Sequence, residues 1–150
     1  MKKEIVELLT NRVTNSLKEN VESKHRIKEL EDENFDQMKA FAMSVIEVVD
    51  ITDKVISHFD ERIEGADKIS LSIFKKYKVI QKRLLSALRQ HGIEKIEFPE
   101  NKLVFGQAEV LETEQHPDKE NEEIISVIQN GYIRGEDVIR PAKVISVKNN

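Results

Sequence analysis

Apolar side chains recur every three or four residues through the middle of the chain, as they do along the buried face of a helix. One row consists of Met38, Phe41, Val45, Val48, Thr52, Val55 and Phe59. A second row lies beside it and consists of Ala42, Val49, Ile56 and Ile63. The combined stripe is wider than a two-stranded coiled coil needs, so it predicts a helix that packs against more than one neighbour.

Before Met38 the same register continues, but polar residues such as Glu31, Lys24 and Asn20 interrupt it. No glycine or proline occurs before Gly65, so the sequence predicts a nearly continuous helix from Met1 to about Arg62. Such a helix would be about 90 Å long. A lone helix of this length is not stable in water, so residues 1–37 are predicted to pair with a second copy as a coiled coil.

A second helix is predicted after a turn at Gly65, with Asp67 as its N-cap and Gly92 at its end. Two helices joined by a short turn form a hairpin, here over residues 38–92, and two hairpins from two chains form a four-helix bundle. The residues predicted to form this dimer interface are Met38, Phe41, Val45, Val48, Val55, Phe59, Ile73, Ile80, Leu84 and Leu88.

Residues 93–150 have a different pattern, and they predict a small all-β domain. Strand candidates are 93–98, 103–111 and 124–128, and residues 116–123 form a polar segment expected to be a mobile loop. Asn130-Gly131 is typical of a type I′ hairpin turn, while Pro141 belongs at a sheet edge or a strand start. The predicted fold class is therefore α+β: a long helix, a helical hairpin and a β domain.

Charge is unevenly distributed around the net value of −4. Residues 1–63 carry 10 basic and 14 acidic side chains, residues 64–92 carry 7 and 2, and residues 93–150 carry 7 and 12. The basic segment could bind nucleic acid through Lys68, Lys75, Lys76, Lys78, Lys82 and Arg83. Neutralisation of the acidic neighbours within the protein is the favoured interpretation.

Composition and motifs argue against catalysis. The chain has no cysteine, and no phosphate-binding loop, zinc-protease or nucleophile-elbow motif is present. The four histidines are dispersed, and Glu109, Glu112 and Glu114 fit a solvated face. We therefore expect no enzyme activity, metal or cofactor. Because there is no signal peptide and no apolar run of membrane length, a cytoplasmic location is expected.

The C-terminal run "NGYIRGEDVIRPAKVISV" resembles the end signature of the GrpE family, G-Y-x-L-x-x-R-x-[IL]-R-P-A-x-V. The matching residues are Gly131, Tyr132, Ile139, Arg140, Pro141, Ala142 and Val144. Upstream, "VVDITDKVI" is similar to the family's V-x-D-x-x-[DE]-[RK]-A through Asp50, Asp53 and Lys54. "LLSALRQHGIEKI" resembles the family's helix end and its exit into the β domain.

The resemblance implies a homodimeric nucleotide exchange factor, a co-chaperone of DnaK-type chaperones. Its β domain would bind the chaperone's ATPase domain and favour an open nucleotide cleft, so that ADP leaves. It implies partner-binding roles for Asn101, Ile128, Asp137, Arg140 and Ser146. Gly131, Tyr132 and Pro141 would set the shape of the β domain, and Arg140 is equally expected to form an internal ion pair.

The chain departs from the family pattern at several positions. Asp137 stands where an arginine is usual, Lys76-Tyr77-Lys78 replaces Gly-apolar-Glu, and Gly106 replaces a histidine. These changes leave the expected fold intact and bear on which chaperone is served. The alternative function is a dimeric coiled-coil scaffold whose β domain binds another kind of partner.

Overall fold

The computed structural model describes residues 1–61 and 64–149 and divides into two compact units, Met1–Ala40 and Phe41–Asn150. One helix, α1 (Lys2–Asp60), runs through both units, so the predicted long helix is confirmed. Arg62, its predicted end, and Ile63, assigned to the second apolar row, lie outside the described residues. The domain boundaries proposed at residues 37 and 92 stay predictions.

The first unit is a single stretch of α1. Its backbone is fully helical, and the hydroxyls of Thr10 and Thr14 donate to the carbonyls of Val6 and Thr10 at 2.8 Å. Apolar side chains along it are exposed, among them Ile5, Val6, Leu9, Val13, Leu17, Val21 and Ile27. Nothing within this unit covers them, because a single helix has no second layer.

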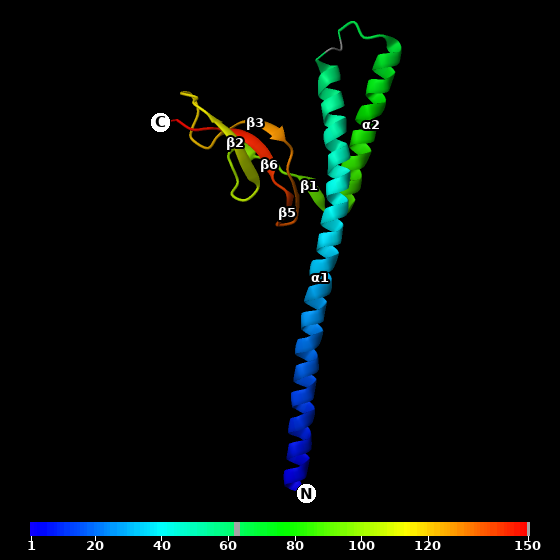
Figure 1. The fold of residues 1–150 in the computed structure, drawn as a ribbon, viewed down its shortest axis with the longest axis vertical. Helices are drawn as coiled ribbons and strands as arrows, with labels where there is room; N and C mark the ends of the chain where they lie inside the picture. The colour runs from blue at the N-terminus through cyan, green and yellow to red at the C-terminus, as the bar shows by residue number, and fades with distance from the viewer. Residues whose placement is uncertain (62–63, 150) are drawn as a thin grey trace. The chain divides into compact units, whose positions relative to one another are not determined.

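The second unit begins with a helical hairpin, in which α2 (Lys68–Gln90) runs back alongside the end of α1 (Figure 1). Gly65 has a φ of 89° before it, and the Asp67 side chain caps it by accepting from the Ser70 amide at 2.7 Å. Gly92, with a φ of 73°, follows its end. The predicted turn, N-cap and helix end are therefore confirmed.

The hairpin buries members of both predicted apolar rows and leaves part of the first row exposed. Ala42, Ile46, Val49 and Thr52 are buried on α1, and Phe59 stacks on the buried Phe74 of α2 with ring centroids 4.5 Å apart. In the first row, Phe41 is 65% exposed and Val48 is 45% exposed. The chain's own hairpin therefore buries Ala42 and Val49 of the second row together with Thr52 of the first, and leaves Phe41 and Val48 uncovered.

The β module, residues 93–149, confirms the predicted α+β class. Two three-stranded sheets have the orders β1-β4-β5 and β2-β6-β3. The first sheet is antiparallel; in the second, β6 pairs in parallel with β2 and antiparallel with β3 (Figure 1). The strands are β1 (Ile93–Lys95), β2 (Ala108–Glu114), β3 (Ile124–Gln129), β4 (Tyr132–Arg134), β5 (Asp137–Arg140) and β6 (Ala142–Val147), and a 3-10 turn η1 (Pro99–Asn101) follows β1.

The core of the module is built on β6, the central strand of its sheet. Ala142 and Val144 are fully buried and pack with Ile124. Phe98, Leu103 and Ala108 close over this cluster. Pro141 precedes β6, as predicted, and costs no sheet hydrogen bond there because it lies between β5 and β6.

The predicted hairpin turn at Asn130-Gly131 is wrong. It separates β3 from β4, and these strands belong to different sheets. The hairpin turn lies instead between Arg134 and Asp137, which pair across it, and Gly135 supplies the positive φ of 61°. The chain needs glycine at 131 for space, because a Cβ there would lie 2.6 Å from the Ile96 Cδ1 and 2.9 Å from the Ala142 Cα.

The polar segment 116–123, predicted to be a mobile loop, is hydrogen-bonded to the C-terminal end of the chain. The His116 amide donates to Asn149 Oδ1 at 2.8 Å, and Asn149 Nδ2 donates to the Lys119 carbonyl at 2.8 Å. Lys119 also pairs with Glu123 at 2.8 Å. These contacts connect the segment to Asn149, two residues after the end of β6.

Replacing Gly131 with alanine should destabilise the β module, because the new methyl group would press on the backbone of Ala142, which cannot rotate away. We expect a loss of about 1–3 kcal/mol in the free energy of unfolding, the usual range for overpacking. Urea titration would measure it. Gly135→Asn is the matched control, since asparagine tolerates a left-handed backbone and nothing lies within 4 Å of a Cβ there. Equal stability of Gly131→Ala and wild type would contradict the close approach.

Candidate partner-binding surface

An ion pair between Asp50 of α1 and Arg140 of β5 joins the helical hairpin to the β module. Arg140 Nη1 donates to Asp50 Oδ2 at 2.6 Å and Nη2 donates to Oδ1 at 2.8 Å. The Asp50 side chain is 19% exposed and the Arg140 side chain is 10% exposed. A two-pronged contact of this kind fixes direction as well as distance, because the planar guanidinium matches the carboxylate.

Asp53 lies one helical turn further along α1 and extends the same contact. Its Oδ2 accepts from Asn130 Nδ2 at 3.1 Å, and its Oδ1 accepts from Gln81 of α2. Gln129 Nε2 donates to Asp50 Oδ2 at 3.0 Å. We call these six residues the aspartate network: Asp50, Asp53, Gln81, Gln129, Asn130 and Arg140.

The network shifts the pKa values of two groups. Partial burial alone would raise the pKa of Asp50, but hydrogen bonds from Arg140 and Gln129 and the charges of Arg140 and Lys54 outweigh burial, and that pKa lies below its ordinary value. Burial and the nearby charges of Asp53 and Asp50 raise the pKa of the Tyr132 phenol to about 12. Asp50 is therefore ionised and Tyr132 neutral near pH 7.

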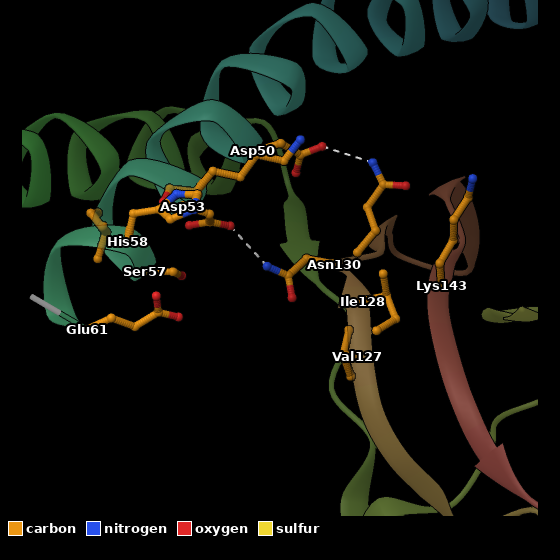
Figure 2. A pocket seen from close by; sticks show the side chains of 12 residues that line it. Asp50, Asp53, Ser57, His58, Glu61, Val127, Ile128, Asn130 and Lys143 are labelled. Atoms are coloured by element: carbon orange, nitrogen blue, oxygen red, sulfur yellow. Dashed lines mark hydrogen bonds between the residues drawn. The ribbon is translucent and has the colours of Figure 1, made fainter. Parts of the chain in front are cut away.

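An open cleft of about 650 Å³ lies beside the network (Figure 2). The β-strand side carries two apolar side chains, Val127 and Ile128, next to Lys143 of β6, and the Asn130 amide points across to Asp53. The helical side of the cleft is lined by Asp50, Asp53, Lys54, Ile56, Ser57, His58 and Glu61. Apolar and charged groups of both signs therefore face the cleft.

The predicted partner-binding residues fall into two groups. Ile128 is 57% exposed, and Asn101 and Asp137 are exposed as well; Asn101 has a φ of 56° in η1. Ser146 is buried, and Arg140 is buried in the ion pair that was its second expected role. Three of these side chains are thus accessible on the module and two lie inside it.

The residues predicted to set the module's shape are placed where they can do so. Tyr132 is fully buried, and Arg140 Cζ lies 5.5 Å from the centre of its ring. Gly131 is buried against the backbone of Ala142, and the exposed Pro141 connects β5 to β6. Their roles toward a partner stay predictions.

Residues proposed for a dimer interface differ in burial. Leu88 is buried, and Met38, Val45, Val55, Phe59 and Leu84 are half-buried. Phe41, Val48, Ile73 and Ile80 are exposed in the single chain. Within the described part of the chain, nothing covers these four side chains.

The positions that depart from the family pattern lie on the surface. Lys78 lies 4.4 Å above the centre of the Phe74 ring and pairs with Asp60 at 3.5 Å. Lys76 is exposed, and Gly106 has a φ of 77° in the turn before β2. Lys78 thus helps to join the two helices, which matches the expectation that basic α2 neutralises acidic neighbours.

Two kinds of feature are absent from the described part of the chain. Among residues 1–61 and 64–149, no three histidine, aspartate or glutamate side chains gather as metal ligands would. Within those same ranges, neither helix is sufficiently apolar over a long enough stretch to cross a bilayer.

Sequence patterns identified half of the residues of the aspartate network. Asp50, Asp53 and Arg140 carry the family resemblance, Asn130 was predicted only as a turn residue, and Gln81 and Gln129 had no predicted role. Gln81 and Asp53 are 28 positions apart, and Arg140 and Asp50 are 90 apart. The only local signal was the presence of two carboxylates three residues apart on a helix, which places them on one face.

Comparison with known families settles the relationship, since the family model described as GrpE matches residues 1–148. The chain belongs to the GrpE family. Similar proteins include "Protein GrpE" of Rhizobium leguminosarum bv. trifolii, which is 26% identical over 118 residues, covering 78% of this chain and 56% of that protein.

Two further relatives are similar. "Protein GrpE" of Prosthecochloris aestuarii is 29% identical over 101 residues, covering 67% of this chain and 48% of that protein. "GrpE protein homolog, mitochondrial" of Neurospora crassa is 32% identical over 126 residues, covering 75% and 50%. The chain therefore spans about half the length of the curated relatives it matches.

The ion pair should make stability depend on pH. The pKa of Asp50 is lower in the folded than in the unfolded protein, so its contribution is complete above about pH 4 and is lost as the pH falls through the folded pKa. At pH 7, Asp50→Asn should lower the free energy of unfolding by roughly 3 kcal/mol, and the difference from wild type should shrink at pH 3. Urea titrations at both pH values would measure it.

Asp60→Asn is the matched control on the same helix. Asp60 forms a half-exposed ion pair with Lys78 at 3.5 Å, so its replacement should change stability by less than about 1 kcal/mol at pH 7. An Asp50→Asn effect of equal size at pH 7 and pH 3 would show that the charge of Asp50 contributes nothing.

Proposed function

We propose that the protein is a nucleotide exchange factor that binds the ATPase domain of a DnaK-type chaperone and promotes release of ADP. The match to the GrpE family over residues 1–148 carries this proposal. The β module supports it, because it places exposed side chains such as Ile128 beside a cleft.

Exchange of this kind needs no bond to be made or broken by the factor. The factor would bind the open state of the chaperone's nucleotide cleft more tightly than the closed state, whereas ADP would favour the closed state. Linkage then makes each ligand weaken the other, so binding of the factor expels ADP. Only a shaped surface is required of this chain.

The accessible residues of the module would form that surface. Ile128 offers an apolar side chain, and Asn101 and Asp137 offer polar groups at separate turns or strand ends. Arg140 and Ser146 would act from inside the module by supporting its shape. Asp137, where the family usually has arginine, would favour a chaperone whose facing surface is more basic.

We further propose that the working form is a homodimer. Apolar side chains are exposed along α1, and the uncovered row continues onto the hairpin through Phe41, Val48, Ile73 and Ile80. A second copy with the same stripes could cover them in a coiled coil and a four-helix bundle. No surface within either unit does so.

Loss of the Ile128 side chain should weaken exchange. We expect Ile128→Ala to raise the concentration of factor needed for half-maximal ADP release about fivefold to tenfold, as removal of a central apolar contact does. The measurement is stopped-flow release of a fluorescent ADP analogue from a DnaK-type chaperone of the same organism.

Leu111→Ala is the control, since Leu111 is 51% exposed on β2, at the opposite edge of the same sheet. Equal effects of the two substitutions would remove Ile128 from the binding surface. No acceleration of ADP release by the wild-type factor at saturation would sink the exchange function and favour a scaffold that binds another partner.

Phe41→Ala tests the dimer. In a single chain Phe41 is 65% exposed, so its truncation would cost little, whereas burial by a second copy would make the cost about 3–5 kcal/mol. We expect a lower melting temperature, a stronger dependence of that temperature on protein concentration, and a larger monomer fraction by light scattering. A compact, stable wild-type monomer by light scattering would contradict the dimer.

A further inference from the structure

We propose that Asp50 and Asp53 of α1 are positioning residues that hold the β module in one orientation on the helical hairpin by binding Arg140, Gln129 and Asn130. The functional part of this inference rests on the proposed exchange function. The orientation itself can be tested without any chaperone.

The chain connects the module to the hairpin at one point. Gly92 lies between α2 and β1, and a Cβ there would meet only the Arg134 side chain, at 3.8 Å. Buried Leu88, Ile93 and Tyr132 lie near this connection and line one pocket. Apolar packing at a single glycine junction resists separation but constrains rotation weakly, because it has no directional preference.

The aspartate network supplies a second attachment on the other helix, α1. Asp50 and Asp53 are one turn apart, so both carboxylates face the same side (Figure 2). Asp50 accepts three hydrogen bonds at 2.6–3.0 Å, two from Arg140 and one from Gln129. Asp53 accepts one from Asn130 and one from Gln81, which connects the contact to α2 as well.

Arg140 is itself fixed within the module. Its Nε and Nη2 donate to the Asn130 carbonyl at 3.2 and 2.7 Å, so the guanidinium is bound on the module side and on the helix side at once. The side chain is only 10% exposed, which limits the other positions that it could adopt. Rotation of the module would therefore break several charge-assisted hydrogen bonds together.

A fixed orientation matters for the proposed binding. If the module rotated freely about Gly92, binding would have to select one orientation, and the lost entropy would weaken affinity. The network removes that cost before the partner arrives. It also holds Val127 and Ile128 at the β-strand side of the cleft, opposite His58 of α1.

The first experiment measures orientation in the full-length protein. Because the chain has no cysteine, Glu47→Cys on α1 and Glu136→Cys in the β4–β5 turn, both at exposed positions, give two spin-label sites. Labelled chains are diluted with unlabelled chains so that only distances within one chain are recorded. We expect a narrow distance distribution by pulsed electron resonance for the otherwise wild-type protein.

Asp50→Asn combined with Asp53→Asn should broaden the distribution at least about twofold in width, whereas Asp60→Asn should leave it narrow. Arg140→Lys keeps the charge but loses the two-pronged geometry, so it should give an intermediate width. NMR signals of Val144 and Tyr132 report whether the module remains folded; if the double variant unfolds, Asp53→Asn alone decides. A distribution that stays narrow in a folded variant overturns the proposal.

The second experiment separates orientation from function. In the ADP-release assay, the double variant should need about fivefold to tenfold more factor for half-maximal release, with the same maximal rate. A broadened distribution with unchanged half-maximal concentration would overturn the role in partner binding. If neither the wild type nor the double variant accelerates ADP release, the exchange function is wrong. A broadened distance distribution in the double variant would still support the positioning role.

Discussion

The paired contact between Asp50 and Arg140 is the interaction on which the arrangement of residues 41–149 depends. It joins residues 90 positions apart, and through Gln81 it also involves the second helix. The helical hairpin and the β module each have their own buried side chains. The directional contact between them gives the module a defined place relative to the hairpin.

Apolar packing is distributed unevenly between the β module and the helices. The β module is closed around Val144, Ala142 and Ile124, whereas the helices bury one face and leave apolar side chains such as Phe41 and Val48 exposed. An uncovered apolar stripe on a helix of 59 residues is unfavourable in water, and the chain supplies no further layer for it within either unit. The uncovered apolar side chains of the helices therefore motivate the proposed dimer, and the exposed side chains of the β module are the surface proposed to contact the chaperone.

The sequence predicted the helices well because their signals are local. Helical periodicity, Asp67 as an N-cap and glycines at the helix ends depend on neighbours within a few residues, and all were confirmed. Strand pairing was less predictable: Asn130-Gly131 has the composition of a hairpin turn, yet the chain there crosses from one sheet to the other. Gly131 is needed for its closeness to Ala142, which no local pattern reveals. An internal ion pair of Arg140 was expected, but its partner Asp50 and the other pairings of the aspartate network could not be predicted, since the partners meet only in the folded chain.

A polar attachment suits a module that must be oriented and yet engage a partner. Replacing a largely buried ion pair with apolar side chains often increases stability, so stability alone does not explain Asp50 and Arg140. Apolar side chains at that contact would hold the module closely but would permit sliding and rotation, because their attraction has no direction. Hydrogen bonds from a planar guanidinium allow one geometry, and when they break, water can bind the separated groups. With 19% of Asp50 exposed, water already reaches the edge of the contact. The network therefore contributes more to the direction in which the module points than to whether the module folds.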